Sequence, residues 1–217
     1  MIGPEQLAAG ERAEAAGDYL AAAAAYRSVT TVPNPHLAAD AHFRLGRVSW
    51  RQGRFDVALG AFESARALAE RGGLADLRAS IENGIGAVHY ARGEYGAARQ
   101  AYAAAQALTQ DAAMRGKIIL NLGVIENIEG NLEVAHEHYE RAYRLFRTTG
   151  DDGSAMLALH NRGMLEADLG RWSDADQSFL TAFDLATGAG NQEMIAKILV
   201  NRSELLAERG ALSESID

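Results

Sequence analysis

Residues 45–65 read LGRVSWRQGRFDVALGAFESA, and the same pattern recurs along most of the chain. Gly46 and Gly53 stand seven residues apart, and Phe55, Ala58 and Phe62 follow at spacings of two, three and four. Apolar residues three and four apart share one face of a helix, and a glycine permits the backbone of a tight turn. The stretch therefore predicts a helix, a turn at the second glycine, and a second helix with one apolar stripe.

Four further copies align with this stretch, and a sixth copy begins the pattern without finishing it. The full copies are AGERAEAAGDYLAAAAAYRSV (9–29), IGAVHYARGEYGAARQAYAAA (85–105), LGVIENIEGNLEVAHEHYERA (122–142) and RGMLEADLGRWSDADQSFLTA (162–182), and the partial one is RSELLAERGALSESID (202–217). The turn glycines are spaced by 36, 40, 37, 40 and 40 residues: Gly17, Gly53, Gly93, Gly130, Gly170 and Gly210. One hairpin cannot bury its stripe alone, so the hairpins must stack.

The repeat resembles the tetratricopeptide repeat (TPR) family, in a form with about 40 residues per repeat rather than the standard length of about 34. The resemblance implies an all-α fold, a right-handed superhelix of stacked helical hairpins. We expect one array over residues 1–217, with repeats near 3–35, 39–74, 79–111, 116–150, 156–190 and a partial sixth at 196–217. The expected first helices are 5–16, 36–52, 75–92, 112–129, 153–169 and 191–209, and the second helices 18–31, 55–71, 94–109, 131–148 and 172–187.

Three residues depart from the TPR pattern near the end of the chain. Arg162 and Arg202 stand where the family has leucine. Ser203 replaces the early glycine of the last unit, by which we mean the first of the two glycines seven residues apart, Gly46 in the stretch quoted above. We expect looser packing in that last unit. The incomplete sixth unit suggests the N-terminal part of a longer protein. Its apolar residues predict that the outer side of helix 191–209 is covered by further repeats or by a second copy, as in a homodimer.

Composition and charge argue against several classes of function. The formal net charge of −8 argues against a surface that binds the phosphates of a nucleic acid. No apolar stretch approaches the length that a membrane span needs. The sequence has no cysteine, hence no disulfide or thiolate metal site. We expect a cytoplasmic protein, because no export signal is recognisable.

No pattern of catalytic or metal-ligating residues stands out. His136 and His138 are two apart on a helix and point to different faces, and pairing of His136 with Glu140 would not suffice for zinc. The sequence therefore predicts neither an enzyme nor a cofactor or metal site.

The resemblance implies that the first helices line a concave groove that binds a peptide or protein segment. Two residues before the early glycine of the last three units stand Asn121, Asn161 and Asn201, spaced by 40 residues. An amide side chain carries both a donor and an acceptor, so such a row can bind a peptide backbone. The alternative is that each asparagine only bonds to a neighbouring helix.

The other predicted groove residues include a basic cluster with one aromatic residue. Arginines three and four apart share one helix face and suit an acidic ligand, with a tryptophan beside them for apolar or cation–π contact: Arg44, Arg47, Arg51 and Trp50. The alternative is a solvated face balanced by Asp40 and Asp56. The remaining candidates are Asn83, Tyr90, Lys117, Asn127 and His160.

The sequence thus predicts a non-enzymatic TPR module that binds a peptide or protein segment in its groove. Two alternatives stay open: a regulatory or sensor domain at the N-terminus of a larger signalling or transcription-regulating protein, and a self-associating scaffold.

Overall fold

The structure is a computed structural model that describes residues 2–214, with side chains from residue 3 to residue 208. These residues form eleven α-helices and no strand. The chain divides into two compact units, Met1–Thr109 (unit 1) and Gln110–Asp217 (unit 2). No helix in the described part is long and apolar enough to cross a membrane.

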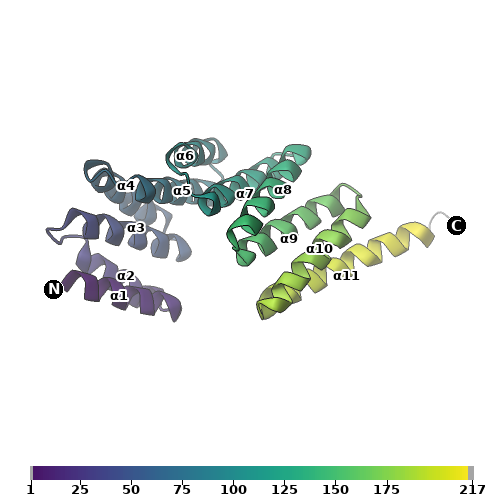
Figure 1. Cartoon of the computed structure of the whole chain (residues 1–217), viewed down its shortest axis with the longest axis horizontal. Helices are drawn as coiled ribbons and strands as arrows, with labels where there is room; N and C mark the ends of the chain where they lie inside the picture. The colour runs from purple at the N-terminus through teal and green to yellow at the C-terminus, as the bar shows by residue number, and fades with distance from the viewer. Residues whose placement is uncertain (1, 215–217) are drawn as a thin grey trace. The chain divides into compact units, whose positions relative to one another are not determined.

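Unit 1 holds three hairpins, and unit 2 holds two hairpins and a last helix (Figure 1). Unit 1 consists of α1 (Ile2–Ala15), α2 (Tyr19–Val29), α3 (Pro35–Arg51), α4 (Phe55–Arg71), α5 (Ala75–Ala91) and α6 (Tyr95–Leu108). Unit 2 consists of α7 (Ala112–Ile128), α8 (Leu132–Thr149), α9 (Asp152–Asp168), α10 (Trp172–Gly188) and α11 (Gln192–Glu214). Within each unit, each second helix packs between the first helix of its own hairpin and that of the next, where there is one. The all-α stack of hairpins is confirmed.

Local signals begin and end these helices where the sequence indicates. The side chains of Asp18, Asn34, Asp111 and Asp151 accept bonds from backbone N–H groups at the starts of α2, α3, α7 and α9. Five of the six predicted turn glycines adopt positive φ, between 70° and 81°: Gly17, Gly53, Gly93, Gly130 and Gly170.

The sixth predicted turn is wrong. α11 continues through Gly210 to Glu214. A glycine inside a helix costs only about 1 kcal/mol, and the described residues hold no second helix against which the chain could fold at that point. The rest of the partial sixth unit, residues 215–217, lies outside the described residues.

The early glycines lie directly against the aromatic rings of the second helices. A Cβ at Gly46 would lie 2.6 Å from the Phe62 ring, and one at Gly86 would lie 2.5 Å from the Tyr102 ring. The aromatic residues of the five hairpins are at most 1% exposed: Tyr26, Phe62, Tyr102, Tyr139 and Phe179. The glycines therefore let each second helix approach its first helix closely enough to bury the aromatic ring between them.

Candidate functional site

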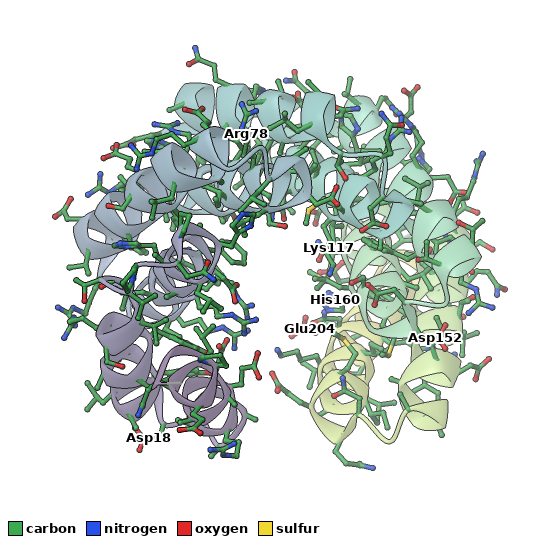
Figure 2. All side chains as sticks on the ribbon, turned by 60° about the vertical axis from the view of Figure 1, so that its left-hand side comes forward. Asp18, Arg78, Lys117, Asp152, His160 and Glu204 are labelled. Carbon is green, nitrogen blue, oxygen red and sulfur yellow. The ribbon has the colours of Figure 1, made fainter. Side chains whose placement is uncertain are left out.

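The three asparagines of the predicted row lie on the first helices of unit 2, one each on α7, α9 and α11. α9 contacts both α7 and α11, and all three asparagines are half-buried. Lys117, His160 and Glu204, from the same three helices, lie along one side of unit 2, whereas Asp152 lies on another (Figure 2). The structure therefore brings Lys117, His160 and Glu204 to one face of unit 2, which we call the α7/α9/α11 surface.

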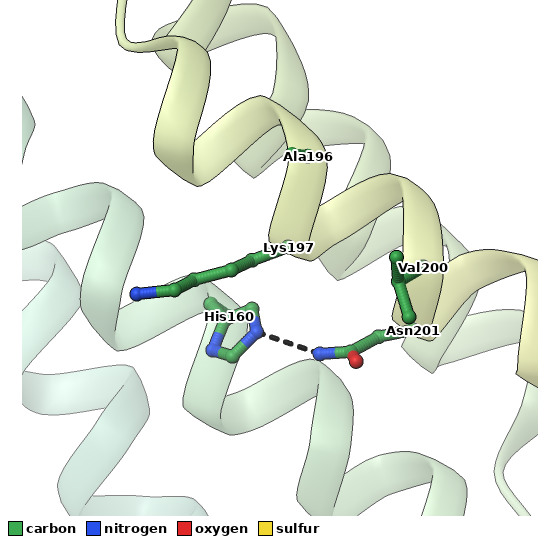
Figure 3. A pocket seen from close by; sticks show the side chains of 5 residues that line it. All are labelled: His160, Ala196, Lys197, Val200 and Asn201. Atoms are coloured by element: carbon green, nitrogen blue, oxygen red, sulfur yellow. Dashed lines mark hydrogen bonds between the residues drawn. The ribbon is translucent and has the colours of Figure 1, made fainter.

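Asn201 and His160 join α11 to α9. The Asn201 amide nitrogen lies 2.7 Å from Nε2 of His160 (Figure 3). An amide nitrogen only donates, so Nε2 accepts and the imidazole is neutral. Asn161 also hydrogen-bonds to His160, and burial lowers the pKa of His160 below its ordinary value, as does the charge of Lys197. The predicted alternative, that an asparagine bonds to a neighbouring helix, therefore describes Asn201 in this structure.

A pocket of about 330 Å³ opens beside this hydrogen bond (Figure 3). It is lined by His160, Ala196, Lys197, Val200 and Asn201. Val200 is 55% exposed and gives the pocket an aliphatic wall. Lys197 forms an ion pair with Glu193, one turn earlier on α11, at 2.6 Å. The pocket thus combines one positive charge, an amide, an imidazole and an apolar wall, which are the groups a peptide end or side chain can use.

Sequence reasoning missed Lys197, Ala196 and Val200. One signal could have found the lysine: Lys117 and Lys197 are 80 residues apart, two repeats of 40, and are the only lysines of the chain. Between them at the same register stands Leu157, which is 42% exposed. Of the predicted residues, Lys117 is exposed and Asn127 is half-buried, both on α7.

The arginine face of unit 1 is neutralised by carboxylates. Arg44 pairs with Glu11 at 2.6 Å and Asp40 at 2.8 Å, and Arg47 pairs with Glu14 at 2.7 Å. Arg51 lies 4.0 Å from the same Glu14 carboxylate. Two of these partners belong to α1, and no spacing in the sequence connects that helix with the arginines of α3.

The expectation that Asp56 balances this face is wrong, because Asp56 pairs with Arg92 at the end of α5. Trp50 stays 38% exposed on α3. On α5, Asn83 is half-buried, and the Tyr90 ring lies 6.1 Å from the ring of Tyr95. These residues lie in unit 1, whereas the α7/α9/α11 surface belongs to unit 2.

A second polar cluster lies among α8, α9 and α10. The Glu166 carboxylate is 3% exposed, and it accepts bonds from Ser178 Oγ at 2.5 Å and from His136 Nε2 at 2.9 Å. Arg162 links Glu140 of α8 to Ser178 of α10. This explains the arginine at a leucine position, because its guanidinium on α9 bonds to side chains of both α8 and α10.

The same cluster bears on the predicted histidine chemistry. His136 pairs with Glu166 of the next hairpin rather than with Glu140. Its Nε2 faces a carboxylate, and Ser178 Oγ donates to that same carboxylate, so the imidazole is not placed to activate the hydroxyl. No group of three or more histidine and acidic side chains in the described part could hold a metal ion.

Stacked hairpins with a shared first-helix surface define a helical-repeat fold. A family model described as tetratricopeptide repeat matches residues 37–111 and confirms the resemblance. No curated protein matches the sequence.

Solved structures show the same fold. Aspartyl phosphate phosphatase F from Bacillus subtilis has a TM-score of 0.80 at 17% identity, over 95% of this chain and 56% of that chain. A Rap protein complexed with Competence and Sporulation Factor has a TM-score of 0.70 at 15% identity, over 95% of this chain and 66% of that one. The Rap conjugation gene regulator of plasmid pLS20, in complex with the Phr* peptide, has a TM-score of 0.76 at 19% identity, over 89% and 55%. The chain thus spans between half and two thirds of the length of these proteins.

Proposed function

We propose that this protein is a non-enzymatic module that binds an extended peptide or protein segment on the α7/α9/α11 surface. The observation that carries the proposal is the pocket between α9 and α11, which lies beside the asparagine row and holds Asn201, His160 and Lys197. Two similar structures contain a bound factor or peptide, which supports this class of ligand for the fold.

The chemistry of the surface suits a peptide main chain with a carboxylate. The amide row supplies donors and acceptors that match backbone groups and do not select side chains. Lys117 and Lys197 place positive charge on α7 and α11, and exposed Leu157 and Met164 on α9 offer apolar contact between them. The ligand is therefore an extended segment that carries both apolar side chains and a negative charge.

Selection from a random peptide library displayed on phage tests this proposal. Replacing Asn121, Asn161 and Asn201 together with alanine should remove most of the affinity for the selected peptides and leave the helix content intact, with a loss of stability of about 1 kcal/mol from the bond between Asn201 and His160. A matched control replaces three exposed residues of α8 and α10 with alanine: Glu137, Arg141 and Gln177. If the asparagine variant binds normally but unfolds at a lower temperature, the row is structural and the proposal fails.

The arginine face of unit 1 remains a proposed site for an acidic ligand. Such a ligand must displace Glu11 and Glu14 from Arg44 and Arg47. Replacing Arg44, Arg47 and Arg51 with glutamate should then weaken acidic peptides most strongly at low salt, because salt screens exposed charges. Equal affinities across ionic strength would speak against this site.

Self-association through α11 is a second candidate function. Leu199 is 48% exposed and Leu206 is 47% exposed on this helix, and an amphipathic face of this kind favours a second copy as its cover. Sedimentation equilibrium should show a concentration-dependent dimer that Leu199→Gln abolishes. A strictly monomeric wild type at high concentration would exclude it.

A further inference from the structure

The pocket between α9 and α11 has a positive charge with which a ligand can pair. Lys197 is its cationic lining residue, and the side chain extends past His160 (Figure 3). Its present partner Glu193 is 79% exposed, and Lys197 itself is 57% exposed. Exposed ion pairs within one helix contribute little to stability. A carboxylate that enters the pocket can therefore replace Glu193 at small cost.

His160 is the second group whose charge the ligand can change. Nε2 accepts a bond from Asn201 in the free protein, so the ring carries no positive charge there. Burial disfavours the imidazolium and lowers the pKa of His160, and the nearby ammonium of Lys197 lowers it further. A negative charge placed in the pocket acts in the opposite direction on the same ring.

Among residues 3–208, the groups found around His160 are aromatic, amide and cationic. From α10 the Phe179 ring packs against the imidazole at 6.2 Å between centroids. From α11 the facing groups are Lys197 and Asn201, and on α9 itself Asn161 hydrogen-bonds to the ring. On this side α7 carries Lys117 and Asn121, and α11 carries Glu204 one turn beyond Asn201, while α8 directs His136 and Glu140 to Glu166 and Arg162.

We propose that this pocket is a carboxylate subsite in which Lys197 binds the negative charge and His160 takes up one proton as the ligand enters. The inference rests on the proposed function in that the subsite belongs to the same α7/α9/α11 surface. The proton comes from hydronium or the buffer acid of the solvent and adds to Nε2, which then donates to the carboxylate instead of accepting from Asn201. Val200 and Ala196 leave room for a short aliphatic group beside the carboxylate.

Proton uptake makes binding dependent on pH with a defined sign. The His160 pKa is low in the free protein and higher in the complex, so affinity rises as the pH falls through the pKa of the complex. It levels off below the pKa of the free protein. A single linked proton changes the dissociation constant by at most about tenfold per pH unit.

The test follows the His160 imidazole resonances by NMR in the full chain, with sodium propionate as the probe. The expected result is a saturable rise of the His160 pKa by about one unit in propionate. Propionamide, and sodium chloride at the same ionic strength, should leave it unchanged. His160→Gln identifies the resonances by their loss and keeps an acceptor for Asn201, and Lys197→Gln should abolish the rise. A pKa that does not move, or that moves equally in chloride or in Lys197→Gln, overturns the proposal.

The outcomes separate the subsite from the proposed function. If selected peptides bind and the asparagine variant loses them, but propionate leaves His160 unchanged, the surface binds peptides and the proton-linked subsite is wrong. If propionate raises the His160 pKa while no peptide binds, the subsite stands and peptide binding is wrong.

Discussion

Phe62 lies between two glycines, Gly46 of its own hairpin and Gly84 of the next. A Cβ at Gly84 would lie 2.7 Å from the ring, so Gly84→Ala forces the ring or helix α5 to move. We expect a loss of about 1–3 kcal/mol in the free energy of unfolding, measured by urea denaturation. Gly84 also occupies the register of the asparagine row, which shows why an asparagine cannot stand there.

Gly60 on α4 is the matched control for this substitution. A Cβ at Gly60 would meet nothing within 4 Å. Gly60→Ala should therefore stabilise the protein by about 0.5–1 kcal/mol, because alanine loses less backbone entropy than glycine in a helix. Equal effects of the two substitutions would contradict this description of Phe62 packing.

The buried histidine His138 makes stability depend on pH. Its Nδ1 is buried without a hydrogen-bond partner in the described structure, and burial lowers its pKa from the ordinary value of 6.5. The unfolded chain then binds a proton more readily than the folded one. The stabilisation is complete above pH 6.5 and is lost as the pH falls from there towards the folded pKa.

Urea denaturation at several pH values measures this effect. The wild type should lose up to about 1.4 kcal/mol per pH unit from this group. His138→Gln should reduce the pH slope and leave the share that comes from His42 and His160, whose pKa values burial also lowers. His36→Gln, at an exposed position on α3, should leave the slope as in the wild type. The same pH slope in all three proteins would show that His138 is not the group involved.

Local spacing predicted the contacts within hairpins but not the partners of charged residues. Gly46 and Phe62 were predictable because both belong to a pattern that every hairpin repeats. The partners of Arg162 were not, because Glu140 and Ser178 lie 22 and 16 residues away, on helices whose rotation only the packed structure fixes. The sequence identified Asn201 as a candidate. Its bond to His160, 41 residues earlier, could not be predicted because it depends on how α9 and α11 pack.

At the scale of helices, the polar cluster of Arg162, Glu140, Glu166 and Ser178 holds α9 between α8 and α10. Arg162→Leu restores the residue typical of the family but removes the arginine from the buried carboxylate of Glu166, while Glu140 keeps its pair with Arg144. We expect a loss of about 3 kcal/mol, because removing one partner of a largely buried ion pair leaves the other charge unpaired. Thermal and urea denaturation measure it.

Arg144 provides the control for the cluster. It also pairs with Glu140, but its side chain is 70% exposed. Arg144→Leu should cost at most about 1 kcal/mol. Adding Glu166→Leu to Arg162→Leu should recover part of the loss, since the buried charge is then gone. No recovery would mean that packing rather than charge determines the role of Arg162.

Leu159 and Leu199 occupy the same register on α9 and α11, and they test the open face of the last helix. Leu159 is fully buried, whereas Leu199 is 48% exposed. Leu159→Ala should cost about 2–5 kcal/mol. Leu199→Ala should change the free energy of unfolding by no more than about 0.5 kcal/mol when the protein is monomeric. A large loss from Leu199→Ala under those conditions would mean that its face is covered within one chain.

At the scale of the whole molecule, the two units carry first-helix surfaces of different chemistry. In unit 1 the arginines of α3 are already paired with carboxylates of α1. In unit 2 the surface keeps a pocket, an amide row and a lysine with only an exposed partner. We therefore expect ligand binding on unit 2 rather than on unit 1. The net charge of −8 repels partners that are themselves strongly acidic overall.

Amide chemical-shift mapping on the full chain, with a peptide selected from the random library, tests peptide binding on the α7/α9/α11 surface most directly. We predict that saturable shifts concentrate on α7, α9 and α11, with the largest at Asn161, Lys197 and Asn201, and that they disappear in the triple asparagine variant. Shifts confined to α8 and α10, or shifts that persist unchanged in that variant, would contradict it.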